Sequence, residues 1–265
     1  MPDTSHPSKL RAWLDTLRQD FAHNHGVAIP FDARTSALAV VICVLLTLFY
    51  YFARPSFYHS NLASDVERVL GMTQSPWRGL LPYYYWALSS TTLRLLIPSA
   101  CIIFWFKEPL SDYGFQRWKR GHAKIYAGFY ALMFPLLAAV SFLPSFQSKY
   151  PFYKAAASSW QQFIAYELAL GVQFAALEGF FRGFIIFALF KRFGYHAITI
   201  MTIPYCMIHF GKPLPETLGS IVAGFALGYM AIKSRSWLPG ALLHWSIGLT
   251  LDVLVIMHRG GFGAA

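Results

Sequence analysis

Residues 160–190 read WQQFIAYELALGVQFAALEGFFRGFIIFALF, and within them only Glu167, Glu178 and Arg182 are charged. A membrane span needs about 20 predominantly apolar residues. This segment is longer than that, so it predicts a membrane-crossing helix that is tilted or that begins as an interfacial segment. Because charges at bilayer depth are costly, we expect the three charged side chains to face the interior of the protein.

The composition of the whole chain is typical of a membrane protein. Of its 265 residues, 56% are hydrophobic and 13% are charged, whereas a soluble domain has about 25% charged residues. This composition argues against a water-soluble globule and excludes a disordered, collagen-like or disulfide-stapled chain. The net charge of +10 lies in short loops between apolar segments rather than on one polar face, so we expect no nucleic-acid partner.

The apolar segments predict an all-α fold, a polytopic transmembrane helix bundle with about seven spans, and an eighth span is left open. The segment 57–80 mixes charged and apolar residues and is expected to form a helix on the membrane surface. We divide the chain into a tail (1–35), the first two transmembrane helices (36–106) and a larger bundle (107–258). The seven predicted spans are 36–53, 84–106, 124–144, 160–190, 195–210, 216–233 and 236–257.

The distribution of lysine and arginine predicts the orientation of the chain. The N-terminal tail and the second, fourth and sixth loops together hold 13 of these residues, and the opposite loops hold 7. The positive-inside rule therefore puts the N-terminus in the cytoplasm and the C-terminus outside. We expect an integral, multi-pass membrane protein with the lipid bilayer as its first partner.

The charged residues predicted to lie well inside the membrane are few. The acids are Glu167, Glu178 and Asp252. Glu178 and Arg182 are four residues apart on one helix, so they share a face and can pair. A buried carboxylate tuned by this arginine can act as a general base, but a structural ion pair between helices explains the same pattern. The bases in the predicted spans are Arg94, Arg182, His209 and His244.

Two histidines on other predicted spans, His209 and His244, complete a candidate site with Glu178. Together the three can hold a water or a metal, and two histidines with one glutamate are a legitimate zinc ligand set. No local pattern such as His-Glu-x-x-His supports a metal. Asp252 is expected to orient a partner or to pair with Arg94 or Arg182 as a buried counter-ion. Glu216 at a helix start is explained by capping.

Three segments in order carry a family resemblance: Glu178-x-x-x-Arg182-Gly183, then Tyr205-x-x-x-His209, then His244 on a later span. Together they resemble the CPBP family of CAAX prenyl proteases and bacteriocin-processing (Abi-type) membrane proteins. The stretch Glu108–Phe115 also looks like a cytoplasmic loop of that family. The resemblance covers about 105–257, so the bundle 107–258 is the CPBP-like part of the chain.

The resemblance implies a role for each matching residue. Glu178 and His209 would activate a water that attacks a peptide bond, His244 and an Asn or Asp one turn later would stabilise the oxyanion, and Arg182 would orient the acid. The substrate implied is a membrane-associated peptide or protein, including CAAX-type processing. Both a zinc mechanism, with Glu178, His209 and His244 as ligands, and a metal-free glutamate mechanism remain open.

The chain departs from the family pattern at two positions. The family has two adjacent glutamates, and here the first is Leu177. Gly248 stands where the family has Asn or Asp, with Asp252 one turn further on. Glu178 can take over as the base, Glu216 or Glu167 can supply another carboxylate, and Asp252 can replace the missing Asn.

These observations leave three functions to weigh. The first is an intramembrane endopeptidase, either a metallo- or a glutamic enzyme. The second is a catalytically inactive family member that acts as an immunity, scaffold or peptide-binding membrane protein, for which Leu177 and Gly248 are the main arguments. The third is an ion-coupled carrier, which would have paired broken helices and an internal repeat. We see neither feature in the sequence.

Overall fold

The computed structural model describes residues 12, 15, 32–118 and 120–263. Over these residues the chain is helical and contains no strand, which confirms the all-α prediction. The helices, in chain order, are α2 (Ala33–Phe52), α3 (Pro55–Asn61), α4 (Ala63–Val69), η1 (Arg78–Leu80), α5 (Leu81–Thr91), η2 (Thr92–Leu96), α6 (Ile97–Ala100), η3 (Cys101–Phe106), η4 (Leu110–Tyr113), α7 (Arg120–Val140), α8 (Pro144–Lys149), η5 (Lys154–Ser158), α9 (Trp160–Glu178), η6 (Gly179–Ile185), α10 (Ile186–Phe193), α11 (His196–Met207), α12 (Leu214–Ser234) and α13 (Leu238–His258).

Among the described residues, six helices are long and apolar enough to cross a membrane. Two of them are composite. The second runs through η1, α5, η2, α6 and η3, and the fourth runs through α9, η6 and α10; in both, the η2, η3 and η6 segments are π-helical turns. The six are Ala33–Phe52, Arg78–Phe106, Gly121–Val140, Trp160–Phe193, Leu214–Ser234 and Leu238–His258.

The helix that forms in the segment 195–210, the fifth predicted span, is shorter than predicted. It corresponds to α11 (His196–Met207), whose 12 residues extend about 18 Å at 1.5 Å per residue, less than the roughly 30 Å of a hydrocarbon core. The chain leaves the helix before His209 and turns through Gly211 and Pro213 into α12. The six long helices and α11 together account for the seven predicted segments.

The chain divides into two compact units, residues 1–43 and 44–265. In the first, Asp32 precedes α2 and accepts hydrogen bonds from Arg34 N and Thr35 Oγ1, as an N-cap residue does. In the second, the predicted surface helix over 57–80 is two short helices, α3 and α4, followed by η1. Pro55 begins α3, and Leu62 interrupts the run between the two helices.

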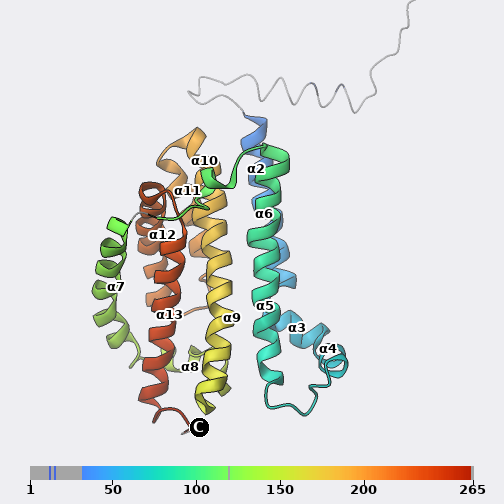
Figure 1. The fold of residues 1–265 in the computed structure, drawn as a ribbon, viewed down its shortest axis with the longest axis vertical. Helices are drawn as coiled ribbons and strands as arrows, with labels where there is room; N and C mark the ends of the chain where they lie inside the picture. Colours follow the sequence, from blue (N-terminus) through green and yellow to red (C-terminus); the bar gives the residue numbers. More distant parts are fainter. Residues whose placement is uncertain (1–11, 13–14, 16–31, 119, 264–265) are drawn as a thin grey trace, which may run out of the picture. The chain divides into compact units, whose positions relative to one another are not determined.

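The long helix Trp160–Phe193 is the centre of the second unit. In its most apolar window 72% of residues are buried, against 11% for the helix Gly121–Val140. Figure 1 shows α9 between α5 and α13, and α9 packs along each of these two helices. The α11–α12 pair packs against η6 and α10, and α7 packs against α13. The segment quoted from the sequence is therefore the core of the fold.

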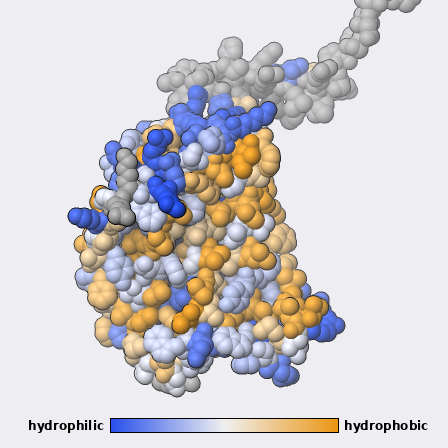
Figure 2. Space-filling model, viewed as in Figure 1, coloured by the Kyte–Doolittle hydropathy of each residue, from blue (hydrophilic) through white to orange (hydrophobic). Residues whose placement is uncertain are grey.

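The outer helices present apolar side chains outward, as lipid contact requires. Leu132 of α7 and Val222 of α12 are each at least 70% exposed. Figure 2 shows hydrophobic residues over most of the coloured flank, with hydrophilic residues gathered toward the ends of the helices. With six apolar helices of spanning length, the chain is an integral membrane protein.

The loops of the second unit gather at its two ends. At one end Lys191 pairs with Glu108 at 2.7 Å, and Ser236 Oγ donates to Gln116 O at 2.7 Å. At the other end Gly263 N donates to Ala157 O at 2.8 Å. The loops after the helices Arg78–Phe106, Trp160–Phe193 and Leu214–Ser234 thus share one end, as the alternation of predicted spans requires. Which end faces the cytoplasm stays a prediction.

Trp237, just before α13, is held in a socket made by three glycines. A Cβ placed at Gly114, Gly179 or Gly183 would lie 3.0, 3.4 and 2.9 Å, respectively, from atoms of the Trp237 ring. The ring is therefore in contact with the loop 107–118 and with η6 at once. This contact fixes the start of α13 against the middle of the central helix.

Candidate active site

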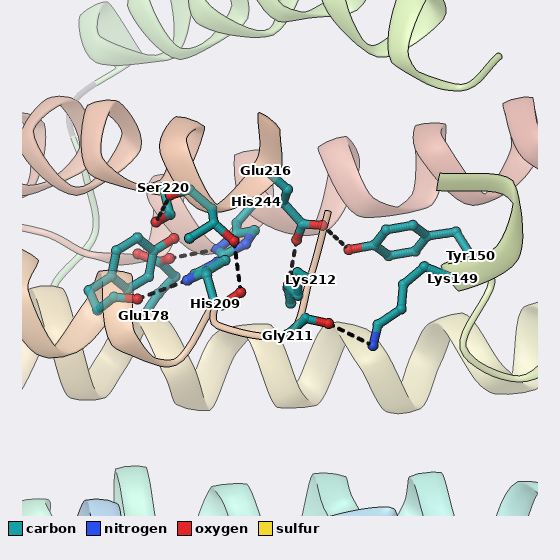
Figure 3. Close-up of polar contacts among 11 residues, drawn as sticks. Lys149, Tyr150, Glu178, His209, Gly211, Lys212, Glu216, Ser220 and His244 are labelled. Atoms are coloured by element: carbon teal, nitrogen blue, oxygen red, sulfur yellow. Dashed lines mark hydrogen bonds and ion pairs between the residues drawn. The ribbon is translucent and has the colours of Figure 1, made fainter. Parts of the chain in front are cut away.

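Glu178 is the last residue of α9, at the point where the helix passes into the π-helical turn η6, and its side chain is fully buried. Its Oε1 atom accepts two hydrogen bonds, from Arg182 Nη1 at 3.0 Å and from His244 Nδ1 at 2.7 Å. The predicted pairing of Glu178 with Arg182 is therefore confirmed. Figure 3 shows Glu178 and His244 meeting between the helices that carry them.

Arg182 connects Glu178 to two further helices. Its Nη2 atom donates to Ala223 O of α12 at 3.4 Å, and its guanidinium lies 3.8 Å from the ring centre of Tyr205 on α11. The side chain is 1% exposed. A buried arginine needs a counter-charge and acceptors, and this one has a carboxylate, a carbonyl and an aromatic face. The geometry fixes the orientation of the Glu178 carboxylate.

The second carboxylate oxygen of Glu178 is different. Oε2 is buried and has no hydrogen-bond partner among the described residues. A buried, ionised oxygen without a donor is costly, so such atoms are commonly found where a reaction or a ligand uses them. One oxygen of Glu178 is thus held by two side chains, and the other has no partner among the described residues.

His244 comes from the first half of α13 and packs against Phe174, with 4.4 Å between the ring centres. A carboxylate can only accept hydrogen bonds, so Nδ1 of His244 carries the proton that it donates to Glu178. The second ring nitrogen, Nε2, is then the one free to act. The His244 side chain is 16% exposed, which makes it the most accessible member of the group.

His209 lies two residues beyond the end of α11 rather than inside a span, and it is 4% exposed. Its Nδ1 atom lies 2.8 Å from the carbonyl oxygen of Tyr205, to which it donates, so Nε2 is its acceptor nitrogen. The Tyr205 ring centre is 4.8 Å from that of His209 and 6.5 Å from that of His244. Tyr205 therefore links both histidines to Arg182.

The zinc ligand set that the sequence leaves open, Glu178 with His209 and His244, is not assembled. Among the described residues no three His, Cys, Asp or Glu side chains are placed to hold one metal ion. Oε1 of Glu178 already accepts two donors, and the Nδ1 proton of His244 is directed at that oxygen. The atoms that these contacts leave over, Oε2 of Glu178 and Nε2 of both histidines, are not brought together at one point either, so the three residues do not form a zinc site in this arrangement.

Glu216 lies in the first turn of α12, as expected for an acid at a helix start. It pairs with Lys212 at 2.7 Å and accepts a hydrogen bond from Tyr150 (Figure 3). Burial raises the pKa of the Tyr150 phenol well above its usual value, and the adjacent carboxylate raises it further, so Tyr150 stays protonated. These contacts explain Glu216 as a structural group rather than a second carboxylate for Glu178.

Asp252 does not pair with Arg94 or Arg182, so both of those predictions are wrong. It is 2% exposed and lies beside Glu167. Glu167 accepts a hydrogen bond from Trp245 Nε1 at 3.0 Å. Neither acid is a partner of Glu178, so neither replaces the residues that depart from the family pattern.

The two departures are explained by packing. Leu177 is 5% exposed and belongs to the buried core. A Cβ at Gly248 would lie 3.2 Å from the Phe174 ring, the same ring that packs on His244. A larger residue at this position would have to move Phe174. Gly248 therefore leaves room for the Phe174 ring, which occupies the space that a side chain at position 248 would take.

Sequence reasoning missed two residues near the site. Gly240, on the first turn of α13, faces Glu178 Oε2; its only sequence signal is a glycine in a helix four residues before His244. Trp237 fixes that turn. Its position against three glycines of distant segments could not be read from spacing along the chain.

Comparison with known protein families identifies the part of the chain that contains the candidate site. The family model described as type II CAAX prenyl endopeptidase Rce1-like matches residues 159–250. No curated protein and no solved structure matches the chain significantly. The matched segment contains Glu178, Arg182, Tyr205, His209 and His244. Residues 159–250 therefore carry the type II CAAX prenyl endopeptidase Rce1-like pattern, and the resemblance of this chain to the CPBP family is confirmed.

Proposed function

We propose that the protein is an intramembrane endopeptidase that hydrolyses a peptide bond of a membrane-associated peptide or protein, with Glu178 as the general base. One observation carries the proposal. Glu178 has one oxygen held by Arg182 and His244 and a second oxygen with no partner, inside the segment that matches a protease family. An oriented carboxylate of this kind is what water activation needs.

The reaction proceeds in two steps. Glu178 Oε2 takes a proton from a water molecule while the water oxygen bonds to the carbonyl carbon of the substrate, which leaves a negative charge on the carbonyl oxygen. The carbon–nitrogen bond then breaks, and the proton passes from Glu178 to the leaving nitrogen. The products are a carboxyl group and an amine, and Glu178 returns to its starting form.

The histidines have separate tasks in this mechanism. His209, whose Nε2 is an acceptor, holds the water. His244, whose Nδ1 donates to Glu178, donates from Nε2 to the developing oxyanion in the doubly protonated form of the ring, in which both nitrogens are donors. Burial strengthens both interactions because little solvent screens them. No step requires a metal ion, so the metal-free glutamate mechanism is the one we propose.

The substrate would approach through an apolar groove between α9 and α13. The groove has a volume of about 340 Å³ and is lined by side chains of both helices, including Ala175, Ala241 and Trp245. Of its lining residues, Ala175 lies within one turn of Glu178 along α9, and Ala241 and Trp245 lie within one turn of His244 along α13. An apolar peptide segment in the bilayer fits this lining.

A catalytically inactive, peptide-binding member remains the second candidate. Leu177 and Gly248 favour it, and so does the complete burial of Glu178. In that case Glu178 serves only as the ion-pair partner of Arg182. The same groove would then hold a peptide without cutting it.

The deciding experiment compares protein termini across the proteome in cells with the natural chain, with Glu178→Gln and with Glu167→Gln, at equal abundance. Glu167 is a buried glutamate on the same helix, about three turns away, and serves as the matched control. We expect a defined set of termini to disappear only with Glu178→Gln. Identical termini in all three, with an intact cellular phenotype, would support the peptide-binding candidate instead.

A further inference from the structure

Gly240 lies on the first turn of α13, on the side that faces Glu178. A Cβ at this glycine would lie 3.6 Å from Glu178 Oε2. Apart from its chain neighbours and the backbone of its own helix, no other heavy atom comes within 4 Å of that point. The free oxygen of the carboxylate therefore borders a small open space that exists because residue 240 has no side chain.

Packing does not explain this glycine as it explains its neighbours. At Gly179 and Gly183 a Cβ would lie 2.6 and 2.9 Å from Leu95 and Trp237, so these glycines are needed for close approach. A Cβ at Gly240 would instead make an ordinary van der Waals contact, at 3.6 Å from Glu178 Oε2. The residue does not have a positive φ angle either. Glycine weakens a helix relative to alanine, so another reason is needed for its presence.

The electrostatics of the position favour a reacting group. The first backbone N–H groups of a helix lack partners within the helix and carry a partial positive charge. In α13, Leu238 N donates to Ser236 Oγ, Ala241 N donates to Trp237 O, and Pro239 has no N–H. Gly240 supplies the remaining amide of this turn. The partnerless oxygen of a fully buried carboxylate thus lies at the positive end of a 21-residue helix.

We propose that Gly240 is a positioning residue for hydrolysis, reserving the place of the attacking water between Glu178 Oε2 and the first turn of α13. The inference rests on the proposed function and specifies where the reaction occurs. A methyl group at this point has nearly the size of a water molecule and takes its place. The positive end of α13 then lies next to the carbon–oxygen bond being formed, where negative charge develops.

The test uses Gly240→Ala in the full-length protein, with Gly219→Ala as the matched control. Gly219 is a glycine inside α12 with nothing within 4 Å of its Cβ position. The substrate is a peptide spanning a cut site found in the comparison of termini. We expect Gly240→Ala to lower kcat about 100-fold or more with KM nearly unchanged, because a displaced reacting atom has this effect. Gly219→Ala should keep both constants.

Thermal unfolding of the same variants separates positioning from packing. A Cβ at 3.6 Å is an ordinary contact, so Gly240→Ala should unfold at the same temperature as the natural chain or higher. A lower unfolding temperature would overturn the inference and assign Gly240 to packing. A natural kcat in Gly240→Ala, while Glu178→Gln is inactive, would overturn it as well and leave the proposed function intact. Activity in Glu178→Gln would instead refute the proposed function.

Discussion

Two π-helical turns of the second unit each carry a buried arginine, and the two arginines are partnered very differently. Arg182 on η6 binds Glu178, the carbonyl of Ala223 and the face of Tyr205. Arg94 on η2 lies 3.3 Å from the ring centre of Phe49, and its Nε and Nη1 atoms have no hydrogen-bond partner among the described residues. Both side chains are at most 2% exposed.

The difference shows that burial of a charge in a membrane helix does not by itself mark a site. π-Helical turns often occur at functional positions. Of these two turns, η6 carries an arginine with a carboxylate, a carbonyl and an aromatic ring as partners, although its Nε has no partner among the described residues, and η2 carries one with an aromatic contact. The turns also touch: a Cβ at Gly179 of η6 would lie 2.6 Å from Leu95 of η2. What distinguishes the site is the group of partners gathered around Arg182.

The largest effect is expected for Arg182→Met. This change leaves Glu178 as a buried charge without its counter-ion, which costs about 3–5 kcal/mol of stability, and it releases the carboxylate from its orientation. We expect loss of proteolysis and a much lower unfolding temperature in detergent. Arg182→Lys is the control, because it keeps the charge and should recover part of the stability but not the Tyr205 contact. A stable and active methionine variant would contradict the assignment.

Gly179→Ala should come next, because it tests the contact between the two turns. The added methyl group meets Leu95 and the ring of Trp237, and overpacking of this kind costs about 1–3 kcal/mol. Thermal unfolding should show the loss, and Leu95→Ala in the same chain should restore most of it by making room. If the double variant is no more stable than Gly179→Ala alone, η2 and η6 are not coupled through this contact.

A smaller effect is expected for Phe49→Leu, which removes the ring beneath Arg94. A desolvated cation–π contact contributes about 2 kcal/mol, so stability should fall by roughly that amount while proteolysis continues. The matched variant is Tyr205→Leu, which removes the ring beside Arg182 and should reduce activity as well. Equal effects of the two changes on activity would remove the distinction between the arginines.

The smallest effect is expected for Arg94→Met. Replacing a buried charge that lacks hydrogen bonds by an apolar side chain of similar length is commonly neutral or stabilising, so the change in stability should lie within about 1 kcal/mol of zero. Unfolding temperature and activity should both match the natural chain. A destabilisation as large as that of Arg182→Met would show that Arg94 has polar partners of equal importance.

The fold was largely predictable because hydropathy and helix length are local properties. The central segment 160–190 stood out by its apolar length and became the most buried helix. The segment 195–210 was predicted as a span, but Pro204 near its end and Gly211 after it limit the helix to 12 residues. The breaks within 57–80 and the π-helical turns depend on packing between helices, which periodicity does not record.

The site was predictable only where its residues are neighbours along one helix. Glu178 and Arg182 are one turn apart, so their pairing follows from helix geometry. The contact of His244 with Glu178 spans 66 residues. The two were grouped because few ionisable residues lie in the predicted spans and because of the family resemblance, and spacing along the chain did not predict their hydrogen bond. Asp252 was assigned to an arginine because charge balance favours that partner. The fold places it beside Glu167 instead, a neighbour from another helix that charge balance does not indicate.

The socket of Trp237 has a consequence for how such sequences can diverge. Gly114, Gly179 and Gly183 lie in segments far apart along the chain, yet all three touch one indole ring. At Gly114 and Gly183 a Cβ would lie 3.0 and 2.9 Å from the ring, so neither can gain a side chain while the tryptophan stays, and a smaller residue at 237 would leave a hollow beside all three glycines. Across related sequences positions 114, 183 and 237 should therefore change together, in a correlated exchange of ring volume for methyl groups, rather than one at a time.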